Sequence, residues 1–489
     1  MFRRHPYIPV LLLFIAAFAF RLAMICIDPY LHHWDEHFHA LVAKNMIDHP
    51  LKPMLLVHPV VPYHISSWTS NHVWVHKQPL FLWQMALSIK MFGYTEIAVR
   101  IPSVVMTSLS VLLVYRITFL MTKNYRGALF AGILICCSSY QFQLISGRYP
   151  TDHNDVAFGF YVLASIWAYV EYLRTVSWKW VVLIGVFAGC AILNKWLTGL
   201  LVYSAWGIKA CTDYYAHKDR NNIVRMSISL LICFTVFLPW QLYIYHAFPA
   251  EWAWENEFNN RHLWEAMEAN AGSIFFYLGR YNRYYGLLTI LLFAYGIYVF
   301  ATRHTMDKNI GYALLAFYSV VFVFFSVVVQ TKMTAFVYCV LPIGFVFAGV
   351  GLEELYQRLT KKWIFFIAFG LVILNTAHPV EIWLDPLKSS SRSSKIFNAA
   401  ILKKADQLIP QGIEVVMNLS NNEHVDLMFY SKRNFTAYGG VIREEYLRVL
   451  ASKKIPIAAF MNHGKYVLPA YVEAYPYLYI IPVALKDLP

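Results

Sequence analysis

Long apolar runs alternate with short polar segments along most of the chain, and this pattern predicts membrane-spanning helices. A helix needs about 20 predominantly apolar residues to cross a bilayer. Runs close to this length predict spans at 8–27, 97–121, 127–146, 156–173, 180–194, 196–210, 227–247, 284–302, 310–329, 335–351 and 362–380. The runs 180–194 and 196–210 are short, and one long bent helix there would lower the number of spans. The pattern therefore predicts a polytopic α-helical membrane protein with about 11 spans.

The apolar run at 80–92 is too short to be counted with these spans. Its 13 residues would cross a bilayer only with difficulty, and a span there would place Lys123 and Arg126 outside. If the run lies at the membrane surface, the basic residues of the short loops all fall on one side, as the positive-inside rule requires of the cytoplasm. We therefore predict a juxtamembrane helix at 80–92, a cytoplasmic N-terminus and an external location for the chain after about residue 381.

The pattern changes after the last predicted span. Ser389–Ser394 has the composition of a linker, which we place at 381–394. Strand-like and helix-like segments then alternate, at 413–418, 423–431, 434–438, 443–452 and 455–460. The sequence therefore predicts a transmembrane domain over 1–380, with its first external loop at 28–96, and a small external α/β domain over 395–489.

Composition agrees with a membrane protein and narrows its class. The chain is 58% hydrophobic and 14% charged, whereas charged residues make up about 25% of a typical soluble domain. The net charge of +13 comes from lysines and arginines spread among short loops, which argues against nucleic-acid binding. The seven cysteines lie in apolar segments or in a loop predicted to be cytoplasmic, so no disulfide framework is expected.

The first external loop opens with two acidic residues, Asp35 and Glu36, directly after the first span. Asp35 favours the N-cap of a short helix, and apolar residues between 38 and 46 form a stripe that suits the membrane surface. Desolvation beside aromatic side chains raises the pKa of a carboxylate and makes it a better general base. An ordinary capped helix at the membrane interface is the alternative to a pair of catalytic residues.

A second short external loop, 147–155, carries Asp152 and Asp155. Asp155 directly precedes an apolar run, where it can cap the helix and also take part in chemistry. Four cations from separate segments lie at the same predicted face: Lys77, Arg148, Lys195 and Lys332. Each alone is explained as an anchor at the membrane edge, but together they predict a binding site for a phosphate group.

Histidines are concentrated in the first external loop, where nine of the 18 lie between His32 and His76. Their spacing matches no zinc template, and the HExxH pattern is absent. His76 with Glu36 is a candidate pair of ligands for a divalent metal, and polar loop residues without such a role are the alternative. The sequence implies no other cofactor.

The order of these motifs resembles the GT-C superfamily of membrane glycosyltransferases over roughly residues 1–380. The likeness is to the branch that contains protein O-mannosyltransferases and the bacterial transferase that adds aminoarabinose to lipid A. In chain order, the matching features are Asp35-Glu36, Lys77-x-Pro79-Leu80, Arg100-Ile-Pro-Ser103, Arg148 with Asp155, Asn194-Lys195, and Lys332 with Tyr338 and Leu341-Pro342. The family has a single acid in this second external loop, whereas this chain has two. Asp155 fits the family spacing better than Asp152, because the apolar run follows it directly.

The resemblance implies a glycosyltransferase that moves a sugar from a polyprenyl-phosphate carrier, such as undecaprenyl phosphate, to a lipid, glycan or protein acceptor, with inversion. Asp35 would accept the proton of the acceptor hydroxyl, and Glu36 and Asp155 would orient the acceptor or Asp35, with Asp152 as a second candidate acid. The residues expected to bind the donor phosphate are Lys77, Arg148, Lys195, Lys332 and Tyr338. In the aminoarabinose transferase, an acid that helps to hold a metal stands where this chain has His76.

Two other classes of protein are considered. A transporter or flippase for a lipid-linked glycan needs polar groups that line a path through the spans, whereas most charged residues here gather at one face, with Arg21 and Arg116 as exceptions. A receptor or adaptor would leave the loop acids unexplained. The short loops and the bacterial branch favour a bacterial inner membrane, with the active site and the C-terminal domain in the periplasm.

Overall fold

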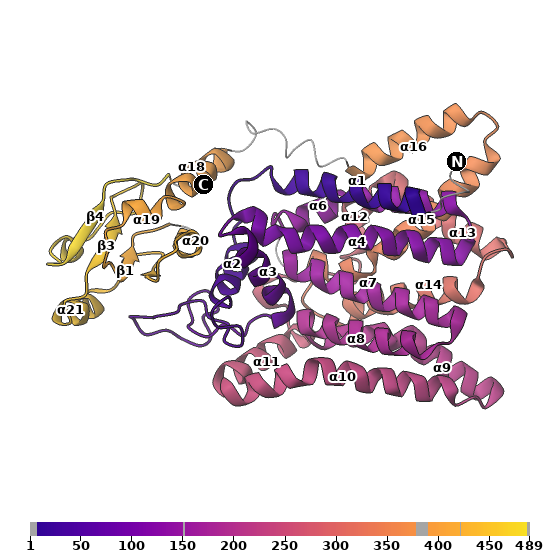
Figure 1. The fold of residues 1–489 in the computed structure, drawn as a ribbon, viewed down its shortest axis with the longest axis horizontal. Helices are drawn as coiled ribbons and strands as arrows, with labels where there is room; N and C mark the ends of the chain where they lie inside the picture. Colours follow the sequence, from indigo (N-terminus) through magenta and orange to yellow (C-terminus); the bar gives the residue numbers. More distant parts are fainter. Residues whose placement is uncertain (1–6, 150–151, 378–389, 421, 487–489) are drawn as a thin grey trace. The chain divides into compact units, whose positions relative to one another are not determined.

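The computed structural model describes residues 7–149, 152–377, 390–420 and 422–486 (Figure 1). The chain forms two compact units. The first, called here the helical unit, comprises 1–24, 103–145 and 151–380. The second, called the mixed unit, comprises 25–102, 146–150 and 381–489, so it combines the first predicted external loop with the C-terminal part of the chain.

The helical unit is built from the apolar segments that the sequence pattern identifies. Its long helices are α1 (Tyr7–Ile25), α4 (Glu96–Thr122), α5 (Tyr125–Cys136), α7 (Asp152–Thr175), α8 (Trp178–Lys195), α9 (Tyr203–His217), α10 (Asn221–Ala247), α11 (Pro249–Trp264), α13 (Leu287–Thr302), α14 (Lys308–Val323), α15 (Leu341–Arg358) and α16 (Lys362–Ala377). The last residue of α1 and residues 96–102 of α4 belong to the mixed unit. Shorter elements are α6 (Ser139–Ile145), η1 (Trp196–Val202), η2 (Met267–Ala269), η3 (Leu278–Arg280), α12 (Tyr281–Tyr285), η4 (Phe324–Val328) and η5 (Thr334–Val340). A 3₁₀ segment, η1, separates α8 from α9, so 180–210 is not one continuous α-helix.

Seven of the described helices are long and apolar enough to cross a membrane, and two bent pairs raise the number to nine. The bent pairs are α5 with α6, at 48°, and 278–285 with α13, at 105°. α16 is a shorter apolar helix. The chain is therefore a polytopic helical membrane protein, and the number of 11 spans stays a prediction.

Helix α15 is the most deeply buried of these candidate spans. It packs against α5 and α13, and glycines at the contacts let the backbones approach closely. A Cβ atom added to Gly296 of α13 would lie 1.8 Å from the carbonyl oxygen of Phe347, and one added to Gly349 would lie 2.6 Å from Ala131 Cβ. These positions therefore cannot take a larger residue without moving a helix.

The mixed unit contains a four-stranded parallel sheet in the order β2-β1-β3-β4. Its strands are β1 (Val415–Met417), β2 (Thr436–Ala437), β3 (Ile457–Phe460) and β4 (Leu478–Ile481). The helices between them are α20 (Glu423–Tyr430), α21 (Glu444–Ser452) and α22 (Ala470–Glu473), preceded by α18 (Ser390–Leu402) and α19 (Ala405–Leu408). Each strand-like and helix-like segment identified between 413 and 460 coincides with one of these elements.

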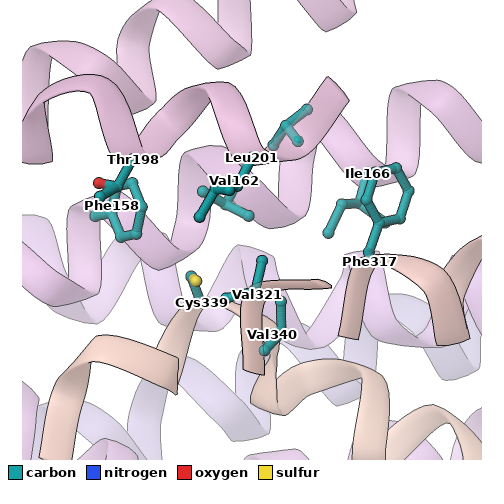
Figure 2. Close-up of a pocket in the computed structure, with 10 residues that line it drawn as sticks. Phe158, Val162, Ile166, Thr198, Leu201, Phe317, Val321, Cys339 and Val340 are labelled. Atoms are coloured by element: carbon teal, nitrogen blue, oxygen red, sulfur yellow. The ribbon is translucent and has the colours of Figure 1, made fainter. Parts of the chain in front are cut away.

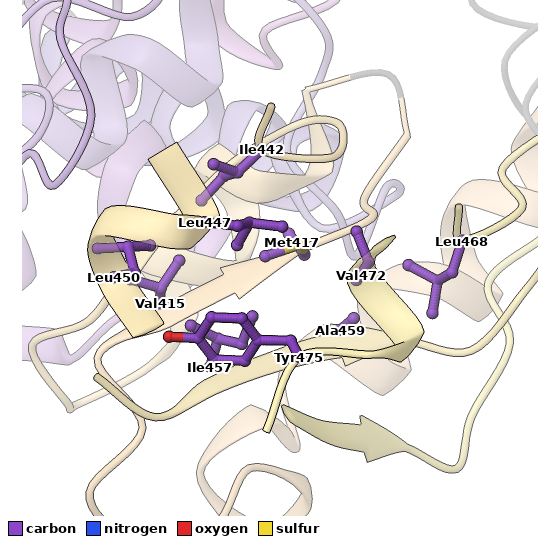
Figure 3. Close-up of a cluster of buried hydrophobic side chains, with 10 residues drawn as sticks. All are labelled: Val415, Met417, Ile442, Leu447, Leu450, Ile457, Ala459, Leu468, Val472 and Tyr475. Carbon is purple, nitrogen blue, oxygen red and sulfur yellow. The ribbon is translucent and has the colours of Figure 1, made fainter. Parts of the chain in front are cut away.

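One face of this sheet packs against α21 and α22 (Figure 3). Val415 and Met417 alternate along β1, as side chains on one face of a strand must, and they meet Leu447, Leu450 and Val472. This apolar cluster fixes the register of the central strands, because a shift by one residue would turn both β1 side chains to the opposite face.

The mixed unit also holds α2 (Asp35–Asn45) and α3 (Pro79–Phe92). α3 agrees with the short helix expected at 80–92, and Pro79 stands in its first turn, where a missing N–H costs nothing. Residues 390–394 of the expected linker begin α18 instead of forming a loop, and 378–389 lie outside the described residues. The proposed domain boundaries at 380 and 394 stay predictions.

Candidate active site

Helix α2 carries the predicted acidic pair in its first turn. Asp35 is the first helical residue and Trp34 is the N-cap, so the expected N-cap position of Asp35 is wrong by one residue. Acidic side chains in a first turn still interact favourably with the positive end of the helix dipole. Phe38 and Leu41, expected at the membrane surface, are buried within the protein instead, because α2 packs against α3 and α20.

Asp35 faces Lys77, a cation in the segment just before α3. Its Oδ1 lies 3.4 Å from Lys77 Nζ and 3.7 Å from His39 Nε2. Burial lowers the pKa of His39 to about 3, so this imidazole is neutral near pH 7. The side chains of Asp35 and Lys77 keep 12% and 16% exposure, so a carboxylate and an ammonium group meet where both retain access to solvent.

Glu36, by contrast, is fully buried and bound on both carboxylate oxygens. Arg100 donates to Oε1 at 2.7 Å and to Oε2 at 3.0 Å, and the backbone N–H of His32 donates to Oε2 at 2.6 Å. Gly147, at φ 72°, lies so close that a Cβ atom would stand 2.2 Å from Glu36 Cδ. This geometry suits a residue that orients its helix, and the orienting role of Glu36 stays a prediction.

Arg148 is paired with a buried acid, Asp28, that the sequence did not single out. Arg148 Nη2 lies 2.5 Å from Asp28 Oδ2, His32 Nε2 bonds the same oxygen at 3.0 Å, and Arg392 Nε donates to Oδ1 at 2.9 Å. Burial alone would raise the pKa of Asp28, but the hydrogen bond from His32 and the charges of His32, Arg148 and Arg392 hold it well below its usual range. The only sequence signal for Asp28 was its position directly after the first span.

In the helical unit, Lys195 at the end of α8 forms an ion pair with Asp155 in the first turn of α7. The ammonium group of Lys195 also lies 4.6 Å from the ring centroid of Phe336. Asp152, in the same turn of α7, accepts a hydrogen bond from the backbone N–H of His153. Asp155 is thus the acid of this turn that pairs with Lys195, and the choice of Asp155 over Asp152 as the functional acid stays a prediction.

Lys332 is nearly inaccessible, with 3% exposure. Its ammonium group donates to the carbonyl oxygens of Phe325 and Ser326, at 2.9 Å each, and of Val329. Burial lowers its pKa. Lys332 therefore caps carbonyl groups at the end of α14 and η4 in this structure, and its contact with a phosphate stays a prediction.

Tyr338 belongs to a buried chain of hydrogen bonds within the helical unit. Its hydroxyl accepts from Gln141 Nε2 at 3.1 Å, and Gln141 Oε1 accepts from Arg21 at 2.7 Å. Arg21 has further acceptors in Thr107 and in the backbone carbonyls of α5, which satisfy a charge that is costly among apolar helices. Gln141 is a residue that sequence reasoning missed, because a lone glutamine carries no motif.

The metal hypothesis finds no support in the donor set. The ring of His76 stacks on Trp68, with centroids 5.0 Å apart, and Arg100 occupies both carboxylate oxygens of Glu36. Across residues 7–149, 152–377, 390–420 and 422–486, no group of three histidine, cysteine or acidic side chains is placed to hold a metal ion. The residues present therefore do not fit a bound divalent metal.

A narrow apolar pocket lies between α7, η1, α14 and η5 (Figure 2). Phe158, Val162, Leu201 and Phe317 are among the side chains that line it, together with Cys339, which follows Tyr338. Its volume of about 10 Å³ has room for one water molecule.

Comparisons with known proteins concern the fold and the sequence of the chain. The family described as dolichyl-phosphate-mannose-protein mannosyltransferase matches residues 76–243. The undecaprenyl phosphate-alpha-4-amino-4-deoxy-L-arabinose arabinosyl transferase of Pseudomonas paraeruginosa (strain DSM 24068 / PA7) is 28% identical over 216 residues, which cover 40% of this chain and 36% of the relative. The enzyme of the same name from Pseudomonas aeruginosa (strain LESB58) is 29% identical with the same coverage. The match thus spans little more than a third of the length of these curated relatives.

The crystal structure of ArnT from Cupriavidus metallidurans bound to undecaprenyl phosphate superposes with a TM-score of 0.59 at 16% identity. The superposition covers 96% of this chain and 85% of that one, so the two share a fold. The chain is therefore related in part of its sequence to the O-mannosyltransferases and the aminoarabinose transferases, and it shares the fold of an aminoarabinose transferase, as the resemblance to the GT-C superfamily predicted.

Proposed function

We propose that this protein transfers a sugar from a polyprenyl-phosphate carrier to a lipid, glycan or protein acceptor, with inversion at the sugar carbon. The observation that carries the proposal is the pair formed by Asp35, in the first turn of α2, and Lys77, just before α3, whose charged groups lie 3.4 Å apart. It combines a partly exposed carboxylate, which can accept a proton, with an ammonium group, which can stabilise a leaving phosphate. Relatives named as undecaprenyl phosphate-dependent transferases and the shared fold support the same reaction class.

In this mechanism Asp35 accepts the proton of the acceptor hydroxyl. The acceptor oxygen then attacks the sugar carbon on the side opposite the carrier phosphate, and the bond between that carbon and the phosphate oxygen breaks. The phosphate leaves with an additional negative charge, which Lys77 stabilises. A single displacement of this kind inverts the configuration at the sugar carbon.

The other proposed phosphate-binding residues each have a partner within the protein. Arg148 pairs with Asp28, Lys195 with Asp155, and Tyr338 accepts from Gln141. Arg148 keeps 15% exposure and Lys195 keeps 16%, so each cation on its own stays accessible to an anion. Lys332 would have to give up three carbonyl contacts, so we assign it the smallest contribution.

We place the protein in a bacterial inner membrane with 11 spans and a cytoplasmic N-terminus. In this topology the reaction and the C-terminal α/β domain lie in the periplasm. The basic residues of the short loops support this orientation by the positive-inside rule. Reporter fusions at Lys123 and after Ser394 test it, because they should report opposite sides of the membrane.

A transfer assay tests the activity. Purified protein in lipid is mixed with a panel of radiolabelled polyprenyl-phosphate sugars and a membrane extract, with Asp35→Asn as the matched variant. Label transferred by the wild type and not by Asp35→Asn supports both the reaction and the base. Failure with every donor, in folded protein that still binds the lipid carrier, would favour a flippase for lipid-linked glycans.

A further inference from the structure

Three consecutive residues at the start of α2 have three different partners. Asp35 meets Lys77, Glu36 is bound by Arg100, and His37 Nδ1 lies 2.6 Å from Asp426 Oδ1. Successive residues of an α-helix point about 100° apart. Anchoring Glu36 and His37 therefore fixes the direction in which Asp35 points.

We propose that Asp426, on α20, is a positioning residue for Asp35, and that α20 is the template which orients the first turn of α2 for the transfer reaction. The inference rests on the proposed function, because Asp35 acts as the base only in that mechanism. It gives the C-terminal α/β elements a part in catalysis that the sequence motifs do not assign. Asp426 itself makes no contact with the reacting atoms in this proposal.

The contact between His37 and Asp426 is a buried, directional hydrogen bond. His37 has 0% side-chain exposure and Asp426 has 11%. Within the described residues, the other ring nitrogen of His37, Nε2, is buried without a hydrogen-bond partner. A buried nitrogen without a hydrogen-bond partner is better tolerated when it is unprotonated than when it carries an N–H group. We therefore place the proton on Nδ1, which donates it to Asp426. The carboxylate thus sets both the tautomer and the orientation of the ring.

A second contact joins the far end of α2 to the same helix. Lys44 Nζ donates to the carbonyl oxygens of Met428 and Ser431, at 2.5 Å each, around the last turn of α20. These carbonyls are the groups that a helix C-terminus leaves without intrahelical partners, and a cation there interacts favourably with the dipole. Since His37 and Lys44 are seven residues apart, about 10 Å along the axis, α20 holds nearly the whole length of α2.

The backbone before α2 shows why such restraint is needed. Trp34 adopts φ 73° and ψ −120°, a conformation that is unfavourable for a residue with a Cβ atom. Such conformations persist only where surrounding contacts over-determine them. If the His37 anchor is lost, this turn can relax toward an ordinary conformation and displace Asp35 from Lys77.

The test compares Asp426→Ala and Asp426→Asn with Glu444→Gln, which alters an exposed acid on α21 whose contact is with Arg448 on the same helix. A displacement of about 1 Å at a reacting group costs roughly 100-fold in rate. We therefore expect Asp426→Ala to lower kcat about 100-fold, with KM for the donor nearly unchanged. Asp426→Asn keeps an oxygen that can accept from His37 and should restore most of kcat, while Glu444→Gln should match the wild type.

Hydrogen exchange of the α2 amides supplies a readout that needs no activity. It should be faster in Asp426→Ala than in the wild type and in Glu444→Gln. Wild-type kcat together with wild-type exchange in α2 would overturn the proposal. If Asp426→Ala does not fold, His37→Gln is measured instead, and wild-type exchange in that variant also overturns it. If the wild type transfers no sugar, the proposed function fails, and unchanged α2 exchange in Asp426→Ala then decides against the template as well.

Discussion

Arg100 donates hydrogen bonds to both carboxylate oxygens of Glu36, and neither side chain is exposed to solvent. The guanidinium group also donates to the carbonyl oxygens of Ile25, Asp28 and Tyr30, the residues that lead into α2. One arginine therefore fixes both the acidic pair and the chain that precedes it. This is a stronger constraint than a salt bridge alone.

Breaking the ion pair between Arg100 and Glu36 should destabilise the protein strongly. Removal of one partner of a buried ion pair typically costs about 3–5 kcal/mol, because the other charge is left uncompensated. We expect Arg100→Leu to lose roughly this much stability, and the double variant Arg100→Leu/Glu36→Leu to recover part of it. Chemical unfolding in detergent measures both. Equal stability of Arg100→Leu and the wild type would show that the pair does not hold the acidic turn.

Lys77 should affect the chemical step more than donor binding. If its charge stabilises the leaving phosphate, Lys77→Met should lower kcat roughly 10²–10³-fold, the range seen when an oxyanion donor is removed. Lys77→Arg keeps the charge with a different shape and should retain part of the activity. Steady-state kinetics with the labelled donor separates kcat from KM. A rise in KM alone would assign Lys77 to ground-state binding.

Gly147→Ala should impair function by displacing Glu36. A Cβ atom at this position would overlap the Glu36 carboxylate, and φ of 72° is unfavourable for alanine. Gly412→Ala is the matched control, since Gly412 has φ 84° and no atom within 4 Å of an added Cβ. The control should lose about 1–2 kcal/mol of stability and keep its activity. Equal behaviour of the two variants would exclude a steric role for Gly147.

Stability of the mixed unit should decrease between about pH 4.5 and pH 7. Burial raises the pKa of Glu423 from 4.5 to about 7, against the hydrogen bonds of Ser420 and Asn398, which lower it. In this interval the unfolded state ionises while the folded state stays protonated, so unfolding becomes more favourable as the pH rises. The shift corresponds to about 3 kcal/mol, present below pH 4.5 and lost by about pH 7.

Glu423→Gln should remove this dependence, and Glu444→Gln, an exposed acid in the same unit, should keep it. Limited proteolysis in urea at pH 5 and pH 8 compares the three proteins. The charges of Asp426 and His37 also affect the pKa of Glu423. A dependence of stability on pH that remains in Glu423→Gln would therefore identify these two residues as its source. A wild type equally stable at both pH values contradicts the prediction.

The sequence predicted the features that depend on local pattern. The positions of helices in the helical unit follow from the length of the apolar runs. Strands such as Ile457–Phe460 follow from residue type and from the alternation of strand-like and helix-like segments. Asp35 and Lys77 could be singled out because an acid and a lysine at membrane-proximal positions carry chemical meaning individually. The structure then brings these two side chains to 3.4 Å.

Other parts of the candidate site depend on contacts that no local pattern encodes. Asp28 and Arg392 are 364 residues apart, and His37 and Asp426 are 389 residues apart. A histidine or an aspartate alone is compatible with many roles, so its partner decides its function. The burial of residues 38–46 was misjudged for the same reason, since α20, which covers part of α2, comes from the distant end of the chain.

The separation of His37 from Asp426 along the chain has a consequence for biogenesis. A ribosome adds about 5–20 residues per second, so α2 emerges roughly 20–80 s before α20 can reach it. During that interval the acidic turn is without its template, and a reactive carboxylate has no fixed orientation. On the proposed template role, the protein would thus acquire competence only after α20 has been synthesised.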